Sequence, residues 1–349
     1  TANKPILQAK VALKQGEGQG SFYLPQSLVS GIYKFRAYTN WMKNFDADDY
    51  FEKRITIINL QKSTNTLTPK QISYDVQFFP EGGDMVNGLQ SRIAFKAMAS
   101  NGNSYAFTGY LLDGKDTLVR FAPIHAGMGD FMFTPAAGHI YKTLIKTNDG
   151  NTFIKELTGA LSSGYTVQLN DETEGDISVK VQTNINNTTK NFLVVHGNLS
   201  IKFAAEGLIK NGSNIFTVKK SVLPDGVSYF TVFNEQMQPV CERLYFKKPV
   251  QHLDLDVHTD QPSYNTRNKV NIDITAENKT LNADAVTLSM SVYRLDSLQT
   301  TDENTIEHYL LLDSDVKGNI ENLSWYFTAT DTETRKPLDL LMLTNGWRR

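Results

Sequence analysis

Cysteine is almost absent from this chain of 349 residues, in which Cys241 is the only one. A single thiol excludes an internal disulfide framework and any metal site built from several thiolates. Cys241 lies in an apparent strand at residues 239–246, and nothing nearby in the sequence marks a catalytic partner. A buried structural cysteine is therefore favoured over a reactive thiol.

A basic excess and a long apolar run are missing as well. The 35 Lys and Arg residues and 37 Asp and Glu residues give a formal net charge of −2. Without excess positive charge to neutralise phosphates, the composition gives no support for nucleic-acid binding. The longest uncharged apolar runs, such as residues 192–195, are far shorter than the roughly 20 residues of a membrane-spanning helix.

The two ends of the chain suggest a piece of a longer protein. Residues 1–5 have no signal-peptide pattern and lead directly into alternating residues, so we expect a mature or excised fragment. The last residues are Trp347, Arg348 and Arg349. An exposed aromatic side chain beside two arginines is an unusual terminus, so we expect more protein to follow.

What the sequence has is two-residue alternation of apolar and polar side chains, which is typical of half-buried antiparallel strands. Such strands are expected at residues 7–13, 33–41, 55–60, 177–181, 253–257, 270–274 and 286–292. Asn-Gly and Asp-Gly dipeptides between the strands tolerate positive φ and indicate hairpins. Many short strands with such turns, and almost no helical periodicity before residue 310, predict an all-β fold of antiparallel β-sandwiches.

A longer pattern recurs at the interval of one module. A strand, a turn with Pro or Gly and a second strand occur at residues 20–40, 129–148 and, more loosely, 216–230. The equivalent positions are 108 and 87 residues apart, being Ile32, Ile140 and Val227. This interval matches an immunoglobulin-like domain of about 100 residues, and agreement in both order and spacing argues against chance.

The repeats divide the chain into four predicted units, at residues 1–60, 71–158, 159–249 and 250–349. The first holds only about four strands, which is too few for a complete sandwich. We therefore expect a partial sandwich that begins inside a module or pairs with a missing segment. The second and third units are expected to be whole sandwiches, and the fourth need not be complete.

Two further segments lie outside the strand pattern. Residues 61–70 are expected to be a polar linker between the first two units. A short helix is expected in the fourth unit near residues 337–345, with Pro337 in its first turn and Gly346 past its end. The predicted fold class is therefore all-β, with tandem immunoglobulin-like sandwiches and a short helical insertion near the C-terminus.

Several segments also resemble a known family. Residues 30–45 (SGIYKFRAYTNWMKNF) resemble the end of a macroglobulin MG2-type domain, and residues 76–88 (VQFFPEGGDMVNG) resemble the start of the next module. Residues 223–227 with 239–246 resemble a module end, and residues 338–349 resemble a segment of large envelope proteins of Bacteroidota. The resemblance spans nearly the whole chain and points to alpha-2-macroglobulin-like module arrays of Bacteroidota cell-envelope proteins.

This resemblance implies more than the residues themselves do. In that family, macroglobulin-type sandwiches follow a signal peptide and often precede a carboxypeptidase-regulatory-like domain and a TonB-dependent receptor plug. It implies a periplasmic or outer-membrane-associated protein of a Gram-negative bacterium. The peptidase-trapping macroglobulins carry a thioester built on a Cys-Gly-Glu-Gln motif. The chain departs from them, because Cys241 precedes Glu242 and Arg243 and cannot form it.

The motifs that come near catalytic or ligand-binding patterns fail on particular residues. Residues 109–116 approach a phosphate-binding loop, but Asp116 replaces the Ser or Thr that would bind magnesium, and an Asp-Gly hairpin explains the segment. Residues 313–318 begin like a calcium loop, but Lys317 occupies a ligand position and Ser324 stands in place of the bidentate Glu. We therefore predict no catalytic and no cofactor-binding residues.

One weak metal candidate and two exposed aromatics remain. Alternation places four side chains on one face of a strand, namely His252, Asp254, Asp256 and His258. Two of them at i and i+2 could chelate a metal if a third ligand arrived from elsewhere, but a solvated outer face explains the pattern and is favoured. Tyr38 and Tyr105 are expected to be exposed and could contact a glycan or a peptide, although core packing absorbs most aromatics of such folds.

The expected function is that of a non-enzymatic scaffold or receptor arm with an outer-membrane or periplasmic protein as its partner. Strand addition to a sheet edge is the expected mode of contact. The resemblance alone implies a link to a TonB-dependent transporter. One alternative is a macroglobulin-like peptidase inhibitor, for which residues 61–70 are the candidate bait. The other is a carbohydrate-binding or carbohydrate-processing module, which would need a cleft with paired carboxylates, and no pair stands out locally in the sequence.

Overall fold

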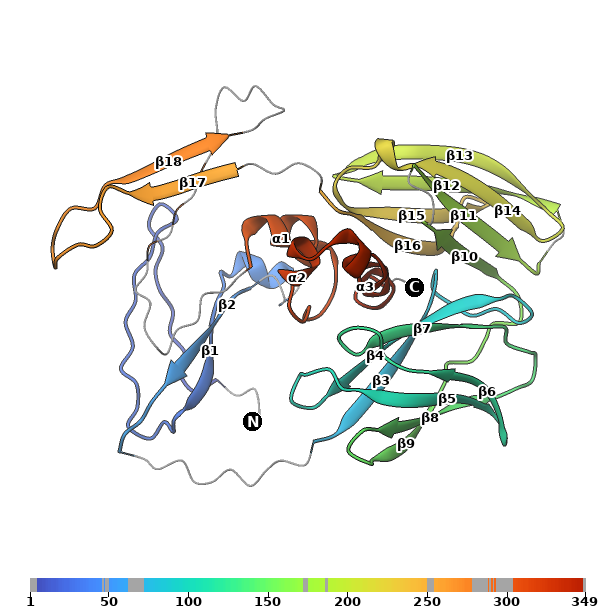
Figure 1. Ribbon diagram of the computed structural model, residues 1–349, viewed down its shortest axis with the longest axis horizontal. Coiled ribbons are helices and arrows are strands. Elements are labelled where there is room, and N and C mark those ends of the chain that lie inside the picture. Colours follow the sequence, from blue (N-terminus) through green and yellow to red (C-terminus); the bar gives the residue numbers. More distant parts are fainter. Residues whose placement is uncertain are drawn as a thin grey trace. The chain divides into compact units, whose positions relative to one another are not determined.

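The computed structural model describes residues 5–45, 47, 50–61, 72–171, 175–185, 188–249, 254–277, 288, 290, 292 and 304–347. The chain divides into two compact units, Thr1–Gln71 with Ser291–Thr301 and Ile72–Met290 with Asp302–Arg349. Each unit is described by itself. All pairings between the named strands are antiparallel (Figure 1). The predicted all-β class is therefore confirmed.

In its described residues the first unit has one two-stranded sheet. β1 (Gly31–Ala37) pairs with β2 (Phe51–Ile57), and the short 3-10 helix η1 (Trp41–Asn44) lies between them. The strand predicted at residues 7–13 does not form; an isolated bridge from Lys14 to Glu17 follows the segment. Alternation in the sequence was not sufficient there, because a strand also needs a neighbouring strand to satisfy its backbone groups.

The second unit begins with a sandwich of two sheets, which we call the first sandwich. One sheet has the order β3 (Tyr74–Pro80), β4 (Ser91–Ala99), β7 (Met128–Phe133). The other has the order β6 (Asp116–Phe121), β5 (Phe107–Asp113), β8 (Tyr141–Thr147), β9 (Thr152–Glu156). Phe95, Phe107 and Phe121 contribute to the core between them. β5 and β6 form the predicted Asp-Gly hairpin, with Gly114 at a φ of +59°.

The second sandwich is formed by one seven-stranded sheet. Its order is β10 (Tyr165–Asn170), β11 (Asp176–Thr183), β14 (Ser213–Lys219), β13 (Ser200–Lys210), β12 (Thr188–Gly197), β15 (Gly226–Asn234), β16 (Pro239–Lys247). β13 and β14 pair only at Lys210 and Ser213, so the sheet folds at this hairpin. The two halves share one core, in which Val179 of β11 lies with Leu193 of β12 and Phe230 of β15.

The remaining elements of this unit are a small sheet and a helical segment. β17 (Asp254–Thr259) pairs with β18 (Ile272–Glu277). The helical segment, residues 304–347, contains α1 (Ile306–Leu311), the 3-10 turn η4 (Asp313–Asp315), α2 (Trp325–Thr328) and α3 (Asp331–Thr344). A further 3-10 turn, η3 (Lys220–Val222), precedes β15. No helix in the described ranges is long and apolar enough to cross a membrane.

The elements are distributed as follows over the four predicted units. β3 to β9 lie within residues 71–158, and β10 to β16 lie within residues 159–249. The described part of residues 250–349 contains the sheet of β17 and β18 and the helical segment. The unit boundaries themselves stay predictions, and the linker predicted at residues 61–70 lies outside the described residues except for Gln61.

Candidate functional site

The helical segment begins its two longer helices with side-chain caps. Thr305 caps α1, and Thr330 caps α3 in a capping box with Glu333. This cap moves the start of α3 six residues before the predicted one. The prediction of Pro337 in the first turn was therefore wrong, because Pro337 lies inside the helix. Gly346 does follow the helix end, as expected.

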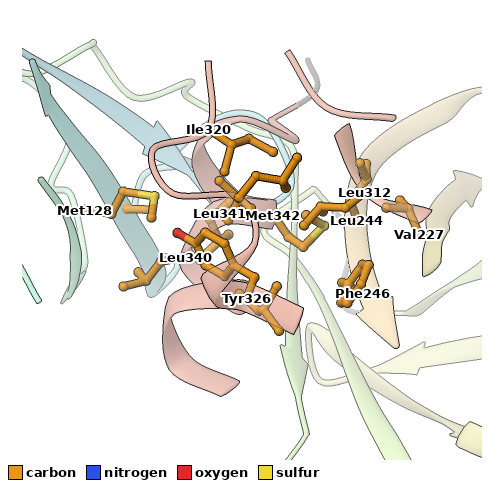
Figure 2. Packing of buried hydrophobic residues seen from close by; sticks show 14 residues of the cluster. Met128, Val227, Leu244, Phe246, Leu312, Ile320, Tyr326, Leu340, Leu341 and Met342 are labelled. Carbon is orange, nitrogen blue, oxygen red and sulfur yellow. The ribbon is translucent and has the colours of Figure 1, made fainter. Parts of the chain in front are cut away.

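The helical segment shares a continuous apolar core with both sandwiches. Figure 2 shows Leu340, Leu341 and Met342 of α3 between Met128 of the first sandwich and Leu244 of the second. These five side chains are nearly inaccessible to solvent. Tyr326 of α2 lies in the same core and is 1% exposed. Burial on this scale makes the segment an integral part of the unit, because the hydrophobic effect is proportional to the apolar area removed from water.

A network of charged side chains, which we call the charge network, lies beside this core. Its members are Glu81, Arg92, Asp130, Arg243, Lys336 and Asp339. Arg243 of β16 contacts both Glu81, at 3.0 Å, and Asp339 of α3. Arg92 of β4 contacts Asp130 of β7 and, at 2.6 Å, Asp339. Asp339 thus bridges an arginine from each sandwich.

The protonation of the network follows from its geometry. Burial raises the pKa of Glu81, which is 1% exposed, although Arg243 and Arg92 oppose this. Burial also acts to raise the pKa of Asp339, but Arg243 and Arg92 outweigh it and lower that pKa overall. Burial lowers the pKa of Arg92, but Asp339 and Glu81 more than offset it, so the guanidinium stays charged. The network therefore holds α3 by charge pairs largely removed from solvent.

The segment between β3 and β4 joins the two sandwiches directly. Glu81 Oε1 accepts a hydrogen bond of 3.2 Å from the backbone N–H of Leu169 in β10. The carbonyl of Gly82 accepts one of 3.3 Å from Glu242 N–H in β16. Gly82 has a φ of +86°, and a Cβ there would lie 2.5 Å from Val167 Cγ1. Only glycine fits this close approach without displacing its neighbour.

The end of the helical segment is also fixed to the first sandwich. Lys96 Nζ of β4 donates a hydrogen bond of 2.8 Å to Asn345 Oδ1. Trp347 Nε1 donates one of 3.0 Å to the carbonyl of Pro80, and the indole packs edge-on against Phe79. Trp347 is therefore half-buried, and the expectation of an exposed aromatic at this position was wrong. An indole with an apolar body and one donor suits such a half-buried place.

The predicted metal candidates lie elsewhere. His252 lies outside the described residues. Asp254, Asp256 and His258 are in β17, which is exposed along its whole length, and His258 Nδ1 is 3.5 Å from Asp256 Oδ2. No group of three or more His, Cys, Asp or Glu side chains in the described part of the chain could hold a metal ion. The structure thus gives these residues no third ligand within the described ranges.

Cys241 and the two predicted tyrosines have different surroundings. Cys241 of β16 is buried in the core of the second sandwich, and burial raises the pKa of its thiol to about 12, which confirms a buried cysteine. Tyr38 is 48% exposed and stacks on Tyr50 at 4.4 Å. Tyr105 was expected to be exposed, but it is half-buried against the core of the first sandwich, and its hydroxyl donates to the carbonyl of Asp75.

Sequence reasoning missed the charge network. Its contacts join residues far apart in the sequence, by 162 positions between Arg243 and Glu81 and by 206 between Lys336 and Asp130. The available signal was indirect: Glu81 follows Pro80 at the end of a strand, and Arg92 is the second residue of the next one. We take this junction, formed by the charge network and the helical segment, as the candidate functional site. Its geometry suits holding modules in place.

No family model matches the chain, and no curated protein matches it. Among solved structures, it is similar to fibronectin(III)-like modules of CbhA from Clostridium thermocellum, at 11% identity and a TM-score of 0.19, over 50% of this chain and 90% of that one. It is also similar to a mutant alpha-2-macroglobulin of Salmonella, at 8% identity and a TM-score of 0.23, over 76% of this chain and 22% of that one.

The methylamine-reacted form of Salmonella alpha-2-macroglobulin is similar at 8% identity and a TM-score of 0.21. It is matched over 75% of this chain and 21% of its own length. The chain therefore spans about a fifth of the length of the macroglobulins that it matches. At TM-scores this low the likenesses carry no argument, and the fold class rests on the strand topology.

Proposed function

We propose that the chain is a non-enzymatic scaffold, an arm of a bacterial envelope protein that holds or recognises a protein partner at the outer membrane. The observation that carries this is the helical segment, which shares one apolar core with both sandwiches and binds both through Asp339. A scaffold needs modules with fixed mutual positions, and a buried joint of this kind supplies them. The link to a TonB-dependent transporter rests on the resemblance of the sequence alone.

Strand addition is the proposed mode of partner binding. β6 and β9 are the outer strands of the four-stranded sheet in the first sandwich. Leu118 of β6 and Ile154 of β9 are 46% and 63% exposed. An extended partner segment could pair with such an edge through main-chain hydrogen bonds, while exposed side chains provide specificity.

An affinity pull-down from detergent-solubilised outer membranes of the source bacterium tests this function. We expect the chain to recover a transporter or another outer-membrane protein in stoichiometric amount, identified by mass spectrometry. The matched controls are Leu118→Lys and Ile154→Lys, because lysine on an edge strand discourages strand addition and leaves the core intact. Recovery of nothing, or only of cleaved chain with a protease, would contradict the proposal.

A carbohydrate-binding role is the second candidate, favoured by the aromatics of the first unit. Tyr38 stacks on Tyr50, and Trp41 is 72% exposed. Exposed aromatic faces provide contact area at low entropic cost. Glycan-array binding that is lost in Trp41→Ala would move the assignment to this role. The peptidase-inhibitor alternative requires cleavage by a protease within residues 61–70, which limited proteolysis would detect.

A further inference from the structure

Two histidines hold the first half of the helical segment. His125, in the turn before β7, stacks on Trp325 of α2 with ring centroids 4.1 Å apart and an interplanar angle of 16°. His308 of α1 stacks on Phe327 of α2 at 4.4 Å and 25°. Both contacts involve α2, one from the first sandwich and one from α1. α2 is therefore held by two stacked imidazole rings as well as by Tyr326 in the shared core.

His308 also caps its own helix through an unprotonated nitrogen. Its Nδ1 accepts a hydrogen bond of 3.3 Å from the backbone N–H of Thr305, and its own backbone N–H donates to Thr305 Oγ1. An imidazolium has N–H groups on both ring nitrogens and cannot accept this bond. Protonation therefore breaks the cap, and it places a charge on a side chain that is 7% exposed.

His125 has a different constraint. Its Nε2 is buried and has no hydrogen-bond partner in the described part of the chain. The ring is enclosed by Trp325 and, edge-on at 5.6 Å, by Tyr326. The doubly protonated ring carries an N–H at Nε2, which is an unsatisfied buried donor unless the ring rearranges, and such a donor costs about 1–3 kcal/mol.

Charged neighbours oppose these effects only in part. Glu321, which also acts on Lys96 of β4, favours the charged form of His125, and Glu307 favours that of His308. The indole face of Trp325 also favours a cation. The ring of His308 stacks on Phe327, which packs against Phe246 of β16, and neither phenylalanine carries a charge. Burial outweighs the acidic groups and lowers the pKa of both histidines.

We propose that protonation of His125 and His308 in mildly acidic solution weakens the docking of residues 304–329 on the sandwiches more than the docking of α3. Both parts bury side chains in the shared core, Leu312 and Tyr326 in residues 304–329 and Leu340 and Leu341 in α3. α3 has in addition the ion pairs of Asp339 and Lys336 with the sandwiches. When residues 304–329 open, they uncover apolar surface on β15 and β16, including Val227 and Phe246. The surface that a partner meets thus depends on pH.

The sign of the effect follows from linkage. Both histidines have a pKa below the ordinary value of 6.5 when docked. As the pH falls below 6.5, the detached state takes up protons that the docked state resists, so docking weakens. At one pH unit below 6.5, each histidine shifts the equilibrium between the docked and the undocked states of residues 304–329 by up to about tenfold toward the undocked state. The two histidines together shift it by up to about a hundredfold.

Hydrogen exchange followed by mass spectrometry on the whole chain tests the proposal, at about pH 7.5 and about pH 5.5. After correction for the intrinsic pH dependence of exchange, we expect protection in residues 304–329 to fall by up to about a hundredfold. Protection in residues 331–344 should stay nearly constant. Equal protection of residues 304–329 at both pH values, or equal losses in both segments, would overturn the proposal.

A matched pair of substitutions removes the titration and keeps the contacts. His308→Gln retains an acceptor for the Thr305 N–H, because Gln is a natural capping-box residue, and His125→Phe retains a stacked ring. The double variant should lose the pH response. The control is His139→Gln, whose ring lies 2.6 Å from Asp113 in the first sandwich, and it should keep the response.

An NMR titration of the two rings in the unsubstituted chain provides a second measurement, which does not depend on the folding of any variant. Both rings should titrate below 6.5, in step with the exchange of residues 304–329. Titration of either ring at or above that value would overturn the proposal. The proposed scaffold function stands or fails separately, because it is tested by partner recovery at neutral pH.

Discussion

The pairs β1–β2 and β3–β4 are alike in sequence pattern and differ in burial. Each pair is antiparallel over seven residues and alternates apolar with polar side chains. Phe35 and Ile55, on the apolar face of β1–β2, remain 39% and 43% exposed. Val76 and Phe95, in β3 and β4, are fully buried beneath the second sheet of the sandwich. Alternation therefore predicts a strand, and burial needs an opposing layer.

Ion pairs show the same contrast. Arg36 and Glu52 lie across β1 and β2 with side chains 42% and 28% exposed. Arg243 and Glu81 are 2% and 0% exposed. A solvent-exposed pair contributes about 0–1 kcal/mol, whereas removing one partner of a buried pair costs about 3–5 kcal/mol. The two ion pairs have similar chemistry, so the difference in their expected contribution to stability comes from their exposure to solvent.

The largest expected effect comes from breaking the buried pair. Arg243→Ala leaves Glu81 and Asp339 without their shared cation and should destabilise the second unit by about 3–5 kcal/mol. The matched Arg36→Ala should change stability by less than about 1 kcal/mol. Urea unfolding of both variants measures the two values. Similar losses in the two variants would contradict the role given to solvent exclusion.

A second test compares apolar side chains. Leu341 in α3 is 1% exposed, so Leu341→Ala should cost about 2–5 kcal/mol through lost burial and the cavity left behind. Ile55→Ala in β2 should cost under about 1 kcal/mol, because its side chain is already 43% exposed. Thermal unfolding measures both. A small loss for Leu341→Ala would mean that α3 does not share the core.

A third test concerns the joint between the sandwiches. Gly82→Ala imposes a positive φ on a residue with a Cβ and drives that Cβ into Val167. We expect a loss of about 1–2 kcal/mol from the backbone and a further loss of about 1–3 kcal/mol from the overpacking. Gly114 also has a positive φ, but a Cβ there would meet no atom within 4 Å. Gly114→Ala should therefore cost only about 1–2 kcal/mol, which is the penalty of a left-handed backbone. Denaturant unfolding measures the loss of stability in both variants. Equal losses would exclude a role for the contact between Gly82 and Val167.

The smallest expected effect is at the start of α3. Thr330→Ala removes the cap and should cost about 1 kcal/mol, with faster hydrogen exchange in the first turn of the helix. Thr39 is the comparison in the first unit, because its Oγ1 accepts the Met42 N–H at 3.2 Å beside the short helix η1. Thr39→Ala should have a smaller effect on overall stability. An unchanged first turn in Thr330→Ala would contradict the assigned cap.

Several strands could be predicted because their signal is local. The alternation at residues 33–41, 177–181 and 270–274 gave β1, β11 and β18, with shifts of a few residues at their ends. Residues 7–13 have the same pattern and form no strand. The sequence of a segment does not state whether a neighbouring strand is available, and this is the physical reason for the failure.

The candidate site could not be predicted, because its signal is not local. Glu81, Arg243 and Asp339 are ordinary charged residues in their own segments, and only the packing of two sandwiches and a helix brings them together. The start of α3 was misplaced for a related reason. Proline at position 337 suggested a first turn, whereas Thr330 and Glu333 form the cap that fixes it.

The single cysteine allows the opening of the second sandwich to be followed over time. Cys241 is enclosed in the second sandwich, where burial raises the pKa of its thiol to about 12. A thiol reagent in solution can react with it only when that sandwich opens, so the labelling rate counts opening events without any engineered probe. The first sandwich has no thiol and therefore does not react in the same experiment. The opening of the second sandwich can therefore be timed separately in the natural chain.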